Sequence, residues 1–131
     1  MIAVLVGCAL LSCSDDDENW EYVGLRQVWV DTIDAPDTLS SVDTLTVILE
    51  EEGGCDRPEF SHVEAVPDSS RIDFTVWADC YEWSGSGAVP PTNTRVWCED
   101  EIPPPYHAGP LLLVAHRPDN SAISDTVLVL P

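Results

Sequence analysis

Apolar and polar residues alternate with a period of two in several short stretches of this chain. The longest such stretch is residues 72–81, where every second residue is apolar, at Ile72, Phe74, Val76, Ala78 and Cys80. Residues two apart lie on the same face of a β-strand, so this alternation predicts strands that are buried on one side. We expect strands at residues 25–33, 44–49, 60–66, 72–81, 94–98, 111–116 and 126–130.

Turn-forming residues separate these stretches, for example Glu52-Gly-Gly54 and Pro103-Pro-Pro105. No segment has a sustained helical period, and eleven prolines are spread along the chain. About seven short strands joined by polar turns predict an all-β fold, a sandwich of two antiparallel sheets with an immunoglobulin-like (Ig-like) architecture.

Two strings resemble strands of bacterial Ig-like modules. Asp43-Thr-Leu-Thr-Val47 is similar to their second strand, and Ala108-Gly-Pro-Leu-Leu-Leu-Val114 to their sixth. The resemblance implies one Ig-like domain over residues 22–131.

The N-terminal residues form an apolar run, Ile2 to Leu11, that ends at Ser12-Cys13. A run of about ten residues is half the length of a membrane-spanning helix and matches the apolar region of a signal peptide. Leu10-Leu11-Ser12-Cys13 resembles the lipobox of bacterial lipoproteins, which implies that residues 1–12 are a signal peptide and that Cys13 is lipidated. A buried N-terminal strand or helix is the alternative, and Leu5-Val6-Gly7-Cys8 is a second string of the same kind.

An acidic block follows this cysteine: Ser14, Asp15, Asp16, Asp17 and Glu18. It resembles the surface-export signal of Bacteroidetes-type lipoproteins, which implies an outer-membrane location and display on the cell surface. It would also serve as a solvated tether, because like charges in a row repel and remain extended. We expect residues 13–21 to form the lipidated cysteine and this acidic tether.

The charge of the chain limits the classes of partner that it can bind. It carries 24 acids against five arginines and no lysine, a formal net charge of −19. Nucleic acid and anionic headgroups would be repelled by such a field. The partners that we expect are therefore the membrane, through the lipid anchor, and a protein or glycan.

Three cysteines remain if Cys8 is removed and Cys13 is lipidated: Cys55, Cys80 and Cys98. An exported domain is in an oxidising compartment, which predicts one disulfide and one free thiol. Because Cys80 is in phase with the apolar face of its strand, we expect it to be buried and free, and Cys55–Cys98 to be favoured over Cys80–Cys98. The spacing of these cysteines lacks the C-x-x-C pattern of zinc sites.

The sequence contains no recognisable catalytic motif, and we expect neither an enzyme nor a bound cofactor or metal. His62, His107 and His116 are scattered, and no Gly-x-Ser-x-Gly elbow is present. The acids at 99–101 could serve a glycosidase or a calcium loop, but a run of acids is usually a solvated face.

The most distinctive candidate for a ligand site is aromatic. Trp77, Tyr81 and Trp83 share the outward side of the longest strand, and Trp97 could lie on a neighbouring strand. Such rings can stack on sugars, but they can equally cover the sheet by packing against Trp20, Trp29 or the loop at 84–92. We therefore expect a lipid-anchored envelope lipoprotein whose domain is a non-catalytic interaction or structural module. The alternative is a carbohydrate-binding surface lipoprotein that uses this aromatic face.

Overall fold

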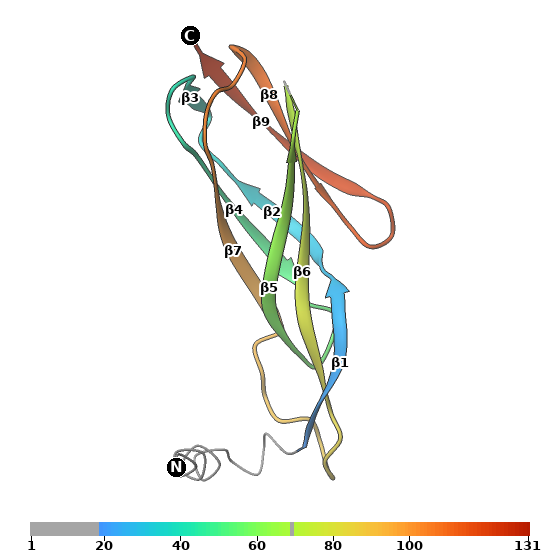
Figure 1. The fold of residues 1–131 in the computed structure, drawn as a ribbon. Coiled ribbons are helices and arrows are strands. Elements are labelled where there is room, and N and C mark those ends of the chain that lie inside the picture. Colours follow the sequence, from blue (N-terminus) through green and yellow to red (C-terminus); the bar gives the residue numbers. More distant parts are fainter. Residues whose placement is uncertain (1–18, 69) are drawn as a thin grey trace, which may run out of the picture.

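The structure is a computed structural model that describes residues 19–68 and 70–131. These residues form nine strands in two sheets (Figure 1). The strands are β1 (Trp20–Gln27), β2 (Trp29–Asp34), β3 (Thr38–Ser40), β4 (Leu45–Glu52), β5 (Arg57–Pro67), β6 (Arg71–Trp83), β7 (Arg95–Ile102), β8 (Gly109–His116) and β9 (Ala122–Leu130). Within these two ranges no helix has the length and apolar character needed to cross a bilayer.

The larger sheet is organised around β6, which has 13 residues. Strand β5 pairs along β6, and β1 and β8 pair with different parts of it: β1 with Trp77–Trp83 and β8 with Arg71–Phe74. Strands β9 and β3 continue the sheet beyond β8, and the sheet is strongly curled. The smaller sheet has the order β2-β4-β7.

The larger sheet is mixed, which corrects the expectation of purely antiparallel sheets. The pairs β6/β8 and β3/β9 are parallel. After β6 the chain crosses to the smaller sheet as β7 and then returns, so that β8 runs in the same direction as β6. This crossing depends on strand order, which alternation along the chain does not encode.

The single strand expected at residues 25–33 is in fact two strands. The chain leaves the larger sheet as β1 ends and enters the smaller sheet as β2, and at the crossing the Val28 N–H donates to the Val76 carbonyl at 3.0 Å. Val28 and Val30 are both buried at this crossing. Strand β3 was not expected, because three residues with one buried side chain, Leu39, are too few to show a period.

The core lies between the two sheets and confirms the predicted faces of β4 and β6. Leu45, Val47 and Leu49 point inward from β4. Phe74 is fully buried on β6, together with its neighbours of the same parity. Leu111, Leu113, Val127 and Val129 complete the core from β8 and β9.

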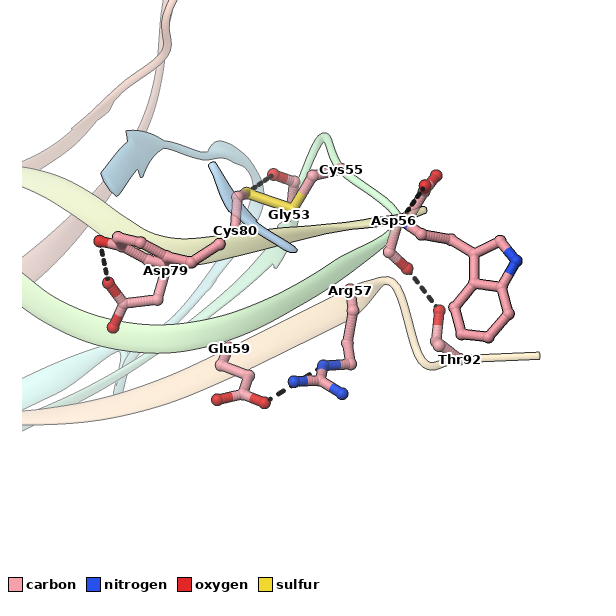
Figure 2. Close-up of a disulfide and its surroundings, with 10 residues drawn as sticks. Gly53, Cys55, Asp56, Arg57, Glu59, Asp79, Cys80 and Thr92 are labelled. Carbon is pink, nitrogen blue, oxygen red and sulfur yellow. Dashed lines mark hydrogen bonds and ion pairs between the residues drawn. A yellow bond between two sulfur atoms is a disulfide. The ribbon is translucent and has the colours of Figure 1, made fainter. Parts of the chain in front are cut away.

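The disulfide joins Cys55 to Cys80, with a Cα–Cα distance of 5.9 Å (Figure 2). Cys98 is a free buried thiol. The predicted Cys55–Cys98 bridge and free Cys80 are therefore wrong. Cys55 lies in the turn between β4 and β5, and this turn returns over β6 because Pro58 is opposite Cys80 in the β5/β6 register. Cys98 instead belongs to the smaller sheet, opposite Leu49. A bridge across 25 residues stabilises the fold by about 3.5 kcal/mol on the chain-entropy account.

The two ends of the described chain lie at opposite ends of an elongated domain (Figure 1). Strand β1 begins at Trp20, slightly before the expected domain start at residue 22, and at the end that also carries the β6–β7 loop. The C-terminus is at the other end. The predicted signal peptide at 1–12, the lipidation site Cys13 and the acidic block Ser14–Glu18 lie outside the described residues.

Candidate functional site

The predicted aromatic residues do share one surface. Trp77, Tyr81 and Trp83 alternate with the buried residues of β6 and lie on the outward side of the larger sheet. The neighbouring strands add rings to the same surface, because Trp20 pairs with Trp83 and Tyr22 with Tyr81 across β1/β6. We call the outward surface formed by Trp20, Tyr22, Trp77, Tyr81 and Trp83 the aromatic face.

Trp83 is a packing residue at one end of this face. Its ring meets that of Trp20 edge to face, with centroids 5.2 Å apart. The ring also lies against Gly85, where an added Cβ would overlap it. Both contacts match the packing alternative, which named Trp20 and the 84–92 loop as partners.

A cation lies within the centre of the aromatic face. The guanidinium carbon of Arg57 is 4.9 Å from the ring centre of Trp20 and 4.6 Å from that of Tyr81. Arg57 also pairs with Glu59 at 3.5 Å (Figure 2). Cation–π contacts of this kind are worth about 0.5–2 kcal/mol. They fix Tyr81 from one side, while Tyr22 contacts it from the other at 5.3 Å.

Two rings of the face are paired with carboxylates. The hydroxyl of Tyr22, a residue that is 53% exposed, donates to Asp79 Oδ1 at 3.0 Å, and this bond raises the pKa of the tyrosine. Trp77 Nε1–H donates to Glu64 Oε1 at 2.8 Å, and its ring stacks on His62 with centroids 6.3 Å apart. Rings beside hydrogen-bonding carboxylates could hold a ligand that is apolar on one side and rich in hydroxyls at its edge.

Trp97 does not belong to the aromatic face. It lies on β7 in the smaller sheet and is 63% exposed, the largest exposure of any tryptophan in the described chain. The prediction that it could sit on a strand next to the other rings is therefore wrong, because the loop after Trp83 carries the chain to the other sheet.

The acids at 99–101 lie within β7 rather than on a loop. Glu99 and Glu101 point outward and Asp100 points to the other side, where partial burial raises its pKa. Asp100 therefore cannot converge with Glu99 or Glu101 on one ion or one glycosidic bond. Among the residues that the structure describes, no three acids, histidines or cysteines are grouped to hold a metal ion.

The three histidines lie apart from one another. His62 stacks on Trp77, and His116 Nε2 is 2.7 Å from Asp73 Oδ1. The hydrogen bond from Arg71, with a smaller contribution from His116, lowers the pKa of Asp73 to about 2. His107 lines a largely apolar cavity of about 360 Å³ beside Tyr106. The Tyr106 hydroxyl donates to the Ile102 carbonyl and accepts from the Leu45 N–H, so it holds the proline-rich loop in place.

Glu51 is a buried acid that the sequence pattern did not predict. It follows Leu45, Val47 and Leu49 on the inward face of β4 and is 0% exposed. Neither carboxyl oxygen has a nitrogen or oxygen hydrogen-bond partner among the described residues, and the weakly donating thiol of Cys98 lies beside the carboxyl. Burial raises its pKa to about 8, and the nearby thiol of Cys98 offsets only part of that rise. Burial and Glu51 together raise the pKa of Cys98 to about 12, so this thiol is inert as a nucleophile at neutral pH.

Comparison with known proteins identifies no relative of this chain. No protein-family model, no curated protein and no solved structure matches the chain.

Proposed function

We propose that this chain is a lipid-anchored lipoprotein of the outer membrane whose Ig-like domain is a non-catalytic interaction or structural module. The observation that carries the proposal is the string Leu10-Leu11-Ser12-Cys13 followed at once by the acidic block at residues 14–18. Lipoprotein precursors have the same order of segments along the chain: an apolar run, a small residue, the lipidated cysteine and then a hydrophilic segment.

The shape of the domain is compatible with such an anchor. Strand β1 begins at one end of the long axis and the C-terminus lies at the other (Figure 1). The six residues from Cys13 to Glu18 can span at most about 20 Å when fully extended. An anchor at Cys13 would therefore hold the β6–β7 loop near the membrane and the C-terminal end away from it.

The surfaces described above are consistent with a non-catalytic module. The acids at 99–101 alternate in direction, the histidines lie apart, and Cys98 is a buried thiol with a raised pKa. The aromatic face is one outward surface that is open to a ligand, since Tyr22 is 53% exposed and its hydroxyl bonds to the Asp79 carboxylate at the surface.

Metabolic labelling with a palmitate analogue tests the anchor. The wild-type chain should incorporate the label, and Cys13→Ala should not, because the lipid is attached through the thiol of that cysteine. Cys8→Ala is the matched control and should label normally. Equal labelling of the Cys13→Ala variant would reject the assignment of Cys13.

The acidic block has its own test. Replacing Asp15, Asp16 and Asp17 by Ala should leave lipidation intact but reduce protease digestion of the protein on whole cells, if the block directs export. Unchanged digestion would mean that the block is only a tether.

A second candidate function is carbohydrate binding by the aromatic face. The pairs Tyr22/Asp79 and Trp77/Glu64 favour it, because each places a ring beside a carboxylate on one outward surface. A glycan array of the wild-type chain would identify a ligand. Tyr22→Ala and Trp77→Ala should then each weaken its binding, whereas Trp97→Ala, on the other sheet, should leave it unchanged. If no glycan binds, this candidate is rejected.

A further inference from the structure

The outward surface of the smaller sheet carries the most exposed tryptophan of the described chain in a strongly acidic setting. Trp97 lies directly opposite Glu50 in the β4/β7 register. Glu99 and Glu101 follow it on the same side of β7, and both are exposed. We call Trp97, Glu50, Glu99 and Glu101 the Trp97 face.

A small hollow opens between the ring and the acid. It has a volume of about 110 Å³, and Glu50, Asn93 and Trp97 line it together with Arg95 and Val96. The Glu50 carboxylate accepts a single hydrogen bond from within the described chain, from the Thr32 hydroxyl at 3.3 Å. A carboxylate has about four acceptor positions, so most of its capacity is directed to solvent.

The one arginine beside the hollow is already neutralised. Arg95 Nη2 donates to both carboxylate oxygens of Asp31 at 2.8 Å, and Nη1 donates to Glu52 Oε2 at 3.1 Å. Two carboxylates thus hold its single charge. Among residues 19–68 and 70–131, neither Glu50 nor Glu99 forms an ion pair of its own. The Trp97 face therefore keeps a negative potential around an exposed π surface.

A positively charged side chain fits this combination. The face of an indole attracts a cation, and the attraction is largest for tryptophan among the aromatic residues. Arginine suits the hollow better than lysine, because its planar guanidinium can stack on the ring and donate two parallel hydrogen bonds to one carboxylate. We propose that the Trp97 face binds an arginine side chain of a basic partner protein.

A second copy of this chain is a poor source for that arginine. The sequence has five arginines and no lysine, and its net charge of −19 repels another copy. Four of the five arginines already contact acids, rings or a carbonyl of their own chain, at positions 57, 71, 95 and 117. The partner is therefore a different protein with exposed arginines. Binding at the Trp97 face does not depend on the lipid anchor.

Titration with two peptides of equal charge tests the inference. Full-length protein in a non-ionic detergent is titrated with acetyl-triarginine amide and with acetyl-trilysine amide at about 150 mM salt, where screening over about 8 Å suppresses diffuse attraction. Saturable binding is expected, with triarginine at least threefold tighter than trilysine. The Trp97 indole N–H resonance, assigned with Trp97→Phe, should shift on titration.

Variants separate a local site from general charge. Trp97→Ala and Glu50→Gln should each weaken triarginine binding by about three- to tenfold and remove the preference over trilysine. Phe60→Ala removes an exposed ring from the other sheet, and Glu21→Gln removes an exposed acid there. Both controls should remain within twofold of wild type. Absence of saturable binding, or equal effects in all four variants, would overturn the proposal.

Discussion

Glu51 should make this domain less stable as the pH rises through neutrality. Its carboxyl is 0% exposed, and its pKa is about 8 in the folded state against 4.5 for the free side chain. Between these two pH values the folded state retains a proton that the unfolded state has released. The stabilisation is therefore fully present below about pH 4.5 and is lost as the pH rises to about 8.

The size of the effect follows from the width of that interval. Each pH unit within it costs 1.36 kcal/mol, so the free energy of unfolding should fall by about 3–5 kcal/mol across it. That is a large part of the 5–15 kcal/mol that holds a typical domain together. Glu51→Gln keeps the shape of the side chain but cannot ionise. It should match the wild type to within about 1 kcal/mol at pH 5 and exceed its stability by about 3–5 kcal/mol at pH 8.5.

Urea unfolding followed by tryptophan fluorescence, at constant ionic strength from pH 5 to 9, measures this difference. Glu50→Gln is the matched control, since it removes the same charge from the adjacent, exposed position of β4. Its difference from wild type should vary little with pH. If the difference between Glu51→Gln and wild type is equally independent of pH, then the buried carboxyl is not protonated in the folded state and the reasoning fails.

Two further predictions concern the core and the disulfide. Phe74→Ala should cost about 3–5 kcal/mol by leaving a cavity, whereas Thr75→Ala on the outward side of β6 should cost less than about 1 kcal/mol in the same urea assay; equal costs would reject the assignment of the two faces. Non-reducing peptide mapping should recover Cys55 joined to Cys80, with Cys98 alkylated only after denaturation, and recovery of a Cys98-containing bridge would contradict the fold around the β4–β5 turn.

The sequence predicts local strand character well and the order of the strands poorly. Alternation in β4 and β6 identifies the buried faces because one face of each strand packs on the core along its whole length. The crossing at Val28 is not visible, because no turn-forming residue separates Leu25 from Val30 while the chain changes sheets. The pairing of Cys55 with Cys80 cannot be predicted from the sequence either, because it depends on which strand the β4–β5 turn returns to.

For the candidate sites too, features within one strand could be predicted, whereas features that depend on strand order could not. The common side of Trp77, Tyr81 and Trp83 follows from their parity on one strand. The contacts of Arg57 with rings on β1 and β6 could not be predicted, because they require β5 and β1 to flank the same strand. The burial of Glu51 could have been predicted, since it lies two residues after Leu49 on the same face of the strand. An acid at such a position, however, is ordinarily interpreted as the end of the strand.

The two outward surfaces carry different electrostatic environments, and this difference constrains what each can bind. Arg57 lies against two rings of the aromatic face, so a cation of the chain itself already occupies the π surfaces of Trp20 and Tyr81. Among the described residues no arginine is stacked on Trp97, because Arg95 beside it is held by Asp31 and Glu52. A neutral ligand on the aromatic face should therefore bind almost independently of salt. A cationic ligand on the Trp97 face should lose affinity as the salt concentration rises, because its attraction depends on exposed carboxylates that counterions screen. Salt dependence therefore distinguishes a cationic ligand on the Trp97 face from a neutral ligand on the aromatic face.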